Sequence, residues 1–415
     1  MPYCDVGTTQ HHSSPPSSSA AVAPADAVNL YNDLKIYYRT YGRGPTKVLL
    51  IIGLAATLEA WGPQIEGLTG TTVHNDDNDD AVSSGNDNDS DGGGIEVCAF
   101  DNRGVGRSSV PAGKSNYSTK IMAKDAVALL DHLGWKKAHV FGHSMGAMIA
   151  CKVAAMVPDR VLSLALLNVT GGGFQCFPKF DRRTFSVAYR FLKAKTPEQR
   201  AEVDLDTHYS QEYLEEYVGT VKRRTILYQQ YVKGISNSGM QSNYGFDGQL
   251  NACWTHKVTQ TEIERIKSAG FLVSVIHGRY DIIAQMYYAQ RLAQRLYPAA
   301  RLVDLHGGHL VSHERPEEVN QALFDLLKAS KGKSDPHDWT NLSNAESWWR
   351  GKRLSFVRNI QGGSNVSLNC RLENLHLFLL YLFGLIVMAF EYGRKLLGSF
   401  KPVRVGSSSS YIESQ

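Results

Sequence analysis

The chain has 415 residues, of which 43% are hydrophobic and 20% are charged. This composition is typical of a globular protein and excludes a collagen-like, coiled-coil or wholly disordered chain. The 44 basic and 40 acidic residues give a formal net charge of +4, which is too balanced to indicate a nucleic-acid partner.

The N-terminal part of the chain carries two low-complexity stretches. Residues 1–27 are rich in Ser, Pro and Ala and lack the apolar core of a secretory signal, which predicts a disordered tail. Residues 71–94 hold seven aspartates and no Lys or Arg. Such self-repelling charge with few apolar residues predicts an acidic disordered insert.

Between residues 28 and 330, short apolar runs alternate with helical patterns. The predicted strands are 47–52, 95–100, 138–141, 161–167, 271–276 and 301–305, with 35–40 as an edge strand. The predicted helices are 118–133, 145–157, 284–296 and 316–328. This alternation predicts an α/β fold with a mostly parallel central sheet and helices on both faces.

Residues 174–256 interrupt the alternation, because they contain no convincing strand and are rich in aromatic side chains. An insertion at the C-terminal edge of a parallel sheet lies above the ligand crevice. We therefore predict an inserted helical cap.

The C-terminal part of the chain changes character twice. Residues 331–371 are polar and predict a linker, and residues 372–393 form a hydrophobic segment. Within it, 375–390 is apolar on every helical face but would span only roughly 24 Å of a roughly 30 Å hydrocarbon core. We predict a membrane anchor that leaves the globular part of the chain on the cytosolic side and residues 394–415 as a tail. A docked helix on a soluble cytoplasmic protein is the alternative.

The segment Gly142-His143-Ser144-Met145-Gly146 follows a predicted strand and opens a predicted helix. The G-x-S-x-G pattern in this context is typical of a nucleophile elbow, in which Gly142 and Gly146 permit a sharp turn around an exposed serine. Ser144 is therefore the predicted nucleophile. The Met145 N–H begins the helix, where an anion is favoured.

A serine nucleophile needs a base and an orienting acid, expected here in the order Ser, acid, His. Asp281 follows the strand 271–276, and His309 follows the strand 301–305 and a glycine pair. We predict that Asp281 and His309 complete a catalytic triad. The competitors are His277, His306, His313 and Asp304, which fit the expected loop placement less well.

An oxyanion hole needs a second backbone N–H from the loop after an early strand. The strand 47–52 is followed by Gly53-Leu54, so we predict Leu54 and Met145 as the two donors. The Gly104-Val105-Gly106 and Gly113-Lys114-Ser115 segments are incomplete nucleotide motifs. No H-E-x-x-H motif or paired Cys/His set appears, and we expect neither metal nor cofactor. The six separated cysteines favour buried thiols in a reducing compartment.

With these motifs, the chain resembles the α/β-hydrolase superfamily and looks like uncharacterised plant members with a helical cap. The matching segments are Asp101–Ser108, Gly142–Gly146, Asp281 in HGRYD and His309 in GGHLVSHERPEEV. One departure is Ile52-Gly53, where many relatives carry His-Gly. The resemblance implies a lidded pocket over Ser144, and serine disfavours the dehalogenase and epoxide hydrolase branches, which use aspartate.

These observations predict a serine hydrolase that cleaves a small or lipophilic carboxylic ester, or a related acyl substrate, through an acyl-enzyme. Two alternatives share the same residues. One is a ligand-binding receptor on this fold, and the other is carbon–carbon bond cleavage or cofactor-free peroxidation.

Overall fold

The computed structural model describes residues 2–7, 34–71, 94–179, 181–238 and 241–343. Contacts divide the chain into two units, residues 1–345 and 346–415, and all described residues belong to the first. The predictions for 344–371, 372–393 and 394–415, and for most of 1–27 and 71–94, lie outside the described residues. Among the described residues, no helix combines the length and apolar character that a membrane crossing requires.

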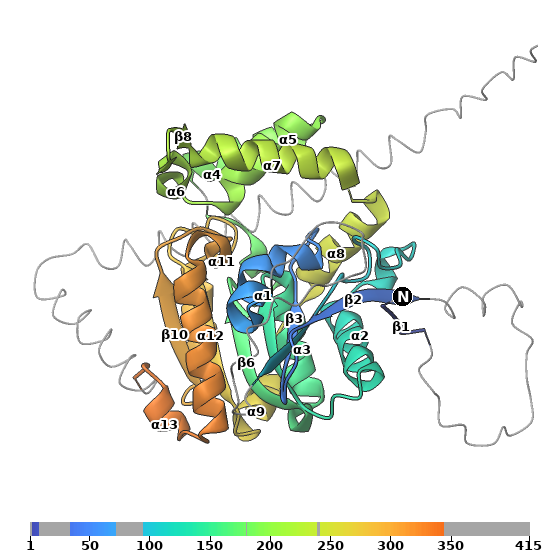
Figure 1. Cartoon of the computed structure of the whole chain (residues 1–415), viewed down its shortest axis with the longest axis vertical. Helices are drawn as coiled ribbons and strands as arrows, with labels where there is room; N and C mark the ends of the chain where they lie inside the picture. Colours follow the sequence, from blue (N-terminus) through green and yellow to red (C-terminus); the bar gives the residue numbers. More distant parts are fainter. Residues whose placement is uncertain (1, 8–33, 72–93, 180, 239–240, 344–415) are drawn as a thin grey trace, which may run out of the picture. The chain divides into compact units, whose positions relative to one another are not determined.

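An eight-stranded sheet runs through the described part of the chain in the order β1-β2-β4-β3-β5-β6-β9-β10 (Figure 1). The pairs from β4 through β10 are parallel, whereas β1–β2 and β2–β4 are antiparallel. The strands are β1 (Tyr3–Asp5), β2 (Lys35–Tyr41), β3 (Thr46–Ile51), β4 (Ile95–Phe100), β5 (Ala138–His143), β6 (Val161–Leu167), β9 (Leu272–Gly278) and β10 (Ala300–Leu305). The predicted mostly parallel sheet is confirmed.

Both faces of the sheet are covered by helices, which explains why the central strands are apolar without alternation. In β3, Leu49 and Ile51 pack into one hydrophobic core, and Val48 and Leu50 pack into the other. The first core receives α2 (Thr119–His132), α3 (Met145–Met156), α9 (Gln260–Ser268) and α10 (Met286–Arg295). The second core receives α1 (Gly62–Thr69) and α12 (Pro316–Lys331), with α11 (Val311–Glu314) preceding α12.

The N-terminus differs from the prediction of a disordered tail. Tyr3–Asp5 forms β1 and pairs with β2, so β1 and not β2 is the edge strand on this side. Cys4 is buried in the first core. Three residues suffice to add a strand because the edge of β2 offers unpaired backbone groups. Cys4, Cys98, Cys151 and Cys253 are buried free thiols and Cys176 is a partly buried one, as the sequence predicted.

The polar stretch after residue 330 also begins differently from the predicted linker. The helix α12 continues to Lys331, and a further short helix, α13 (Pro336–Trp339), follows. Trp339 is buried, and its indole N–H donates to the Val273 carbonyl over 2.9 Å. One large aromatic side chain thus docks a segment whose average composition predicts a solvated chain.

The predicted cap contains α4 (Arg182–Lys193), α5 (Pro197–His208), α6 (Gln211–Glu215), α7 (Arg223–Ser238) and α8 (Asn243–Thr255). It also contains a hairpin of two-residue strands, β7 (Tyr217–Val218) and β8 (Val221–Lys222), which the sequence pattern did not indicate. In Figure 1, α4 to α7 gather at one end of the sheet. The hairpin is too short to produce a recognisable alternation of apolar residues.

Candidate active site

The turn between β5 and α3 holds Ser144 in a strained conformation, with φ 54° and ψ −119°. The surrounding glycines permit this geometry because the backbone is crowded. A Cβ on Gly146 would lie 1.9 Å from the Ile51 carbonyl oxygen, and one on Gly142 would lie 2.3 Å from the Gly146 carbonyl oxygen. Strain held in place by close packing is typical of a functional position.

Ser144, His309 and Asp281 lie in one hydrogen-bonded row at the C-terminal edge of the sheet. His309 Nδ1 donates to Asp281 Oδ2 over 2.7 Å, and His309 Nε2 lies 3.0 Å from Ser144 Oγ. In the neutral imidazole the Nε2 lone pair accepts the serine O–H. Three residues far apart in sequence therefore meet in the predicted order.

The Asp281 carboxylate is surrounded by hydrogen-bond donors. Its Oδ1 accepts from the backbone N–H groups of Ile283 and Ala284, each at 2.8 Å. Its Oδ2 accepts from Asn168 Nδ2 over 2.8 Å as well as from His309. Burial on its own raises the pKa of a carboxyl group, but the interactions with His309 and the other donors lower the pKa of Asp281 to about 2. Asp281 is therefore ionised at neutral pH and holds His309 in one tautomer.

The histidines that competed with His309 have other partners. His306 pairs with Glu212 over 2.8 Å and is 41% exposed. His313 Nε2 donates to the Ala60 carbonyl over 2.7 Å, and His277 Nε2 donates to the Ala284 carbonyl over the same distance. The competing acid Asp304 pairs with Arg279 at the surface. None of these side chains hydrogen bonds to Ser144 among the described contacts.

The loop after β3 lies directly against Ser144, as an oxyanion hole requires. A Cβ on Gly53 would be 3.2 Å from the Ser144 Cβ. No hydrogen bond among the described residues uses the Leu54 or Met145 N–H, whereas the next donor, Ala55 N–H, is bound to Gln249 Oε1 over 2.9 Å. The Leu54 and Met145 N–H groups are therefore both available beside Ser144.

The cap fixes this loop through Gln249, a residue that sequence reasoning missed. The Gln249 side chain on α8 is fully buried, accepts from Ala55 N–H and donates to the Arg103 carbonyl over 2.9 Å. At the start of the same loop, Asn102 Nδ2 donates to the Ile52 carbonyl over 2.8 Å. No spacing rule connects position 249 with position 55, so the sequence held no signal for this contact.

Asn168 is a second residue that the sequence analysis missed. It follows β6, has a positive φ of 48° and is 1% exposed. Its Nδ2 group donates to Asp281 Oδ2 and to the Gly308 carbonyl, so it links the acid to the His309 loop. Its place after a strand at the same sheet edge as Asp281 was a usable signal.

His143, which precedes Ser144, holds the backbone of His309. It is 4% exposed, and its Nε2 donates to the His309 carbonyl over 2.9 Å. Burial, followed by the nearby His309, lowers the pKa of His143 to about 3. His143 is therefore neutral in the folded protein and binds the chain that carries His309.

The low pKa of His143 predicts that the folded protein loses stability in mild acid. Its folded pKa is below the ordinary value of about 6.5, so its contribution is present above pH 6.5 and is lost as the pH falls towards 3. We expect about 2 kcal/mol of this loss by pH 5, because only the unfolded state then binds the proton. Urea unfolding followed by circular dichroism at pH 7.5 and pH 5 measures it.

The His143→Gln variant is the control for this prediction, because Gln keeps an N–H donor but does not titrate. Its free energy of unfolding should fall less between the two pH values, by about 2 kcal/mol. Parallel pH profiles for wild type and variant would contradict the assignment of a neutral His143.

The cap closes on the His309 loop through a buried carboxylate. Glu314, which is 4% exposed, accepts from the Gly308 N–H over 2.7 Å. The same carboxylate accepts from the backbone N–H and the hydroxyl of Ser210 in the cap, over 2.8 and 2.6 Å. One side chain therefore joins the segment that carries Ser210 to the loop that carries His309.

An apolar cavity of about 290 Å³ lies between the cap and the loop that follows Asp281. Its walls include Val187, Ala188 and Phe191 of α4, Thr207 of α5, and Ile282 and Ile283. A larger cavity of about 430 Å³ lies between β9, β10, α12 and α13, among charged side chains and none of the triad residues. The smaller cavity adjoins the site through residues next to Asp281. Among the described residues, no group of three or more His, Cys, Asp or Glu side chains is placed to hold a metal ion.

Comparison with known proteins agrees with this architecture. The chain is 25% identical over 295 residues to a protein assigned as the carbamate hydrolase RutD of Azorhizobium caulinodans, covering 70% of this chain and 94% of the relative. It is 28% identical over 259 residues to a fluoroacetate dehalogenase of a Burkholderia species, covering 57% and 79%.

Among solved structures, the enol-lactonase of Burkholderia xenovorans LB400 superposes with a TM-score of 0.53 at 21% identity. The match covers 71% of this chain and 97% of the lactonase, and it shows a shared fold. The family profile described as the alpha/beta hydrolase fold matches residues 48–316. With its parallel sheet, its strained serine turn and this match, the chain belongs to the alpha/beta-hydrolase family.

Proposed function

We propose that this α/β hydrolase is a serine hydrolase that cleaves a carboxylic ester or a related acyl substrate through an acyl-enzyme. The observation that carries the proposal is the hydrogen-bonded row from Ser144 Oγ through His309 to Asp281. A serine hydroxyl becomes nucleophilic when a base removes its proton, and the base works when a carboxylate orients it.

In the first step, His309 Nε2 takes the Ser144 proton while Ser144 Oγ forms a bond to the substrate carbonyl carbon. The carbonyl π electrons move to oxygen, and the backbone N–H groups of Leu54 and Met145 stabilise the resulting oxyanion. The oxyanion then collapses, the bond to the leaving group breaks, and His309 gives its proton to the leaving oxygen.

In the second step, water replaces the leaving group. His309 takes a proton from the water, which attacks the acyl carbon, and the second oxyanion expels Ser144 Oγ as it regains a proton from His309. Asp281 stays ionised throughout, since its pKa is about 2. The products are the free acid and an alcohol.

The relatives include proteins named for carbamate hydrolysis and dehalogenation, so the family alone does not select the substrate. Position 144 is serine, which supports acyl transfer over the aspartate-dependent dehalogenase branch. The cavity beside Asp281 supports a lipophilic group on the substrate, because its lining is almost purely apolar. An apolar cavity of about 150 Å³ holds one benzene ring, so a volume near twice that accepts about a dozen heavy atoms.

If the substrate acyl chain occupies this cavity, kcat/KM should depend on the length of the chain. A substitution that fills the cavity should change that dependence. The full-length chain is assayed with p-nitrophenyl esters from acetate to dodecanoate. We expect wild type to favour medium chains, and Val187→Phe to shift the optimum to shorter chains and to lower kcat/KM for medium chains about tenfold. The added ring occupies volume that the substrate would otherwise fill.

The matched control is Ser186→Phe, which adds the same ring at the exposed neighbouring position of α4. Its chain-length profile should follow that of wild type. An identical chain-length profile in all three proteins would show that the substrate does not enter the cavity. Absence of turnover with every ester would count against acyl hydrolysis itself.

A further inference from the structure

His208, the last residue of α5, brings a second imidazole beside the catalytic one. Its backbone carbonyl accepts from the Leu310 N–H over 2.9 Å, so this end of the cap helix contacts the His309 loop. The ring centroids of His208 and His309 are 6.0 Å apart. His208 as a whole residue is half-buried.

The hydrogen bond of His208 to its own helix determines which nitrogen remains available. His208 Nδ1 lies 2.8 Å from the Asp204 carbonyl oxygen, and because a carbonyl only accepts, Nδ1 carries the proton. Burial lowers the pKa of His208, and the neighbouring His309 lowers it further. In the neutral ring the Nε2 atom is then an acceptor with a free lone pair. No hydrogen bond among the described residues reaches it.

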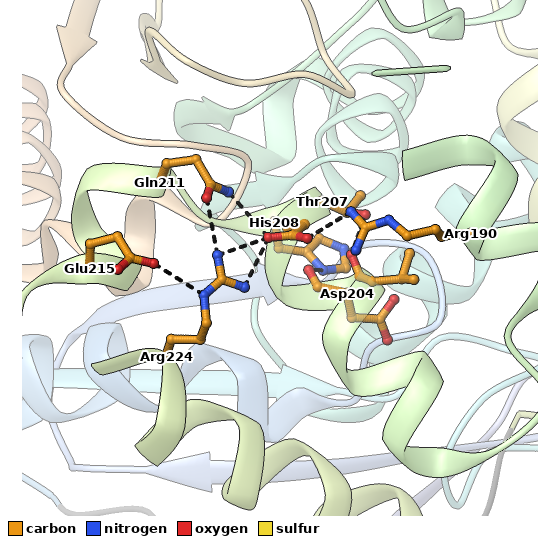
Figure 2. Close-up of polar contacts among 9 residues, drawn as sticks. Arg190, Asp204, Thr207, His208, Gln211, Glu215 and Arg224 are labelled. Carbon is orange, nitrogen blue, oxygen red and sulfur yellow. Dashed lines mark hydrogen bonds and ion pairs between the residues drawn. The ribbon is translucent and has the colours of Figure 1, made fainter. Parts of the chain in front are cut away.

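A charge cluster holds this end of α5 in place (Figure 2). Asp206 accepts from Arg190 of α4 over 2.7 Å and from Arg224 of α7 over 2.9 Å. Gln211 Nε2 donates to the same carboxylate over 3.2 Å. Three other cap helices therefore fix the last turn of α5, so the position of His208 does not depend on its own contacts alone.

We propose that His208 is a specificity residue whose Nε2 accepts a hydrogen bond from a hydroxyl or amide N–H on the substrate, close to the reacting carbonyl. The inference rests on the proposed function and names its substrate class: acyl groups with a hydrogen-bond donor near the carbonyl. A fixed acceptor beside the His309 ring favours such a donor and repels a carboxylate at the same place. The ring spacing to His309 limits the donor to the first few bonds from the carbonyl carbon.

The test compares three esters on the full-length chain: p-nitrophenyl butanoate, 2-hydroxybutanoate and 3-hydroxybutanoate. For each protein, kcat/KM of the better hydroxy ester is divided by that of the plain ester. We expect this ratio to fall about tenfold from wild type to His208→Phe, which is the size of one neutral hydrogen bond. His337→Phe, an exposed histidine on α13, is the matched control and should keep the wild-type ratio.

Two further variants separate recognition from a structural role. Gln places a carbonyl oxygen near the position of Nε2, whereas Asn places its amide near the position of Nδ1 and can still bond the Asp204 carbonyl. His208→Gln should therefore restore part of the ratio, and His208→Asn should not. Fluorophosphonate labelling of Ser144 establishes that each variant is folded with an intact site.

The inference is overturned if the ratio is the same in wild type and His208→Phe, or if Asn restores it and Gln does not. Such results leave the proposed function standing, provided that the plain ester is hydrolysed and labelling depends on Ser144. Failure of wild type on every ester, together with absence of labelling, would instead overturn the proposed function.

Discussion

Replacing Ser144 with alanine should lower ester hydrolysis by at least about 10⁴-fold, because it removes the oxygen that forms the bond to the substrate carbonyl carbon in the proposed reaction. Labelling by a fluorophosphonate should disappear as well. The substitution leaves the backbone turn and the contacts of His309 with Asp281 in place, so the free energy of unfolding should change little. The measurement is steady-state turnover of a p-nitrophenyl ester alongside gel-based labelling of the full-length chain.

A suitable control is Ser186→Ala, which removes an exposed hydroxyl in the cap and should leave both turnover and labelling as in wild type. Full turnover and full labelling by Ser144→Ala would show that another residue is the nucleophile. Labelling of wild type without turnover of any acyl substrate would favour the receptor interpretation of the same fold.

Replacing Asp281 with asparagine should lower kcat by about 10⁴-fold while the protein stays folded. The amide oxygen can still accept the backbone N–H groups of Ile283 and Ala284. The amide nitrogen, however, then faces two other donors, Asn168 Nδ2 and His309 Nδ1. His309 can relieve this clash by moving its proton to Nε2, where it can no longer accept the Ser144 proton.

Turnover as a function of pH tests the Asp281→Asn variant. Because both tautomers of the ring are neutral and differ only in which nitrogen carries the proton, the loss caused by the wrong tautomer should persist when the pH is raised. The matched control is Asp304→Asn, which changes a carboxylate that pairs with Arg279 at the surface and should keep wild-type kcat. A loss under tenfold for Asp281→Asn would exclude Asp281 as the orienting acid.

Many local features could be predicted from the order of residues along the chain. The strands near residues 47–52, 95–100 and 161–167 are short apolar runs, and the structure contains strands at these places because burial on both faces leaves no other pattern available. The helix starts at Ser118 and Pro316 also followed from local chemistry, since the Ser118 hydroxyl accepts from the Ile121 N–H and Pro suits a first helical turn. The turn at Ser144 could be predicted from Gly142 and Gly146, because the crowded backbone there leaves no room for a side chain at either position.

Two short elements, β1 and α13, depend on single contacts that the average composition of a stretch does not reveal. Tyr3–Asp5 joins the sheet through backbone pairing with β2, and Trp339 docks α13 through one buried ring. Each lies in a stretch whose mean polarity predicts a solvated chain. Pairing with the sheet edge and burial of one ring in the core stabilise these short segments even though the stretches that contain them are polar on average.

For the candidate site, the sequence alone predicted Ser144, Asp281 and His309 and their order. Residues that follow successive parallel strands lie at the same edge of the sheet, so these three were expected to meet. The contacts that surround these three residues could not be predicted from the sequence. Gln249 holding Ala55, Glu314 joining Ser210 to Gly308, and His208 facing His309 all arise where the cap meets the sheet. Such contacts join residues 6 to 194 positions apart; they depend on how two independently patterned layers pack, and no local periodicity encodes that packing.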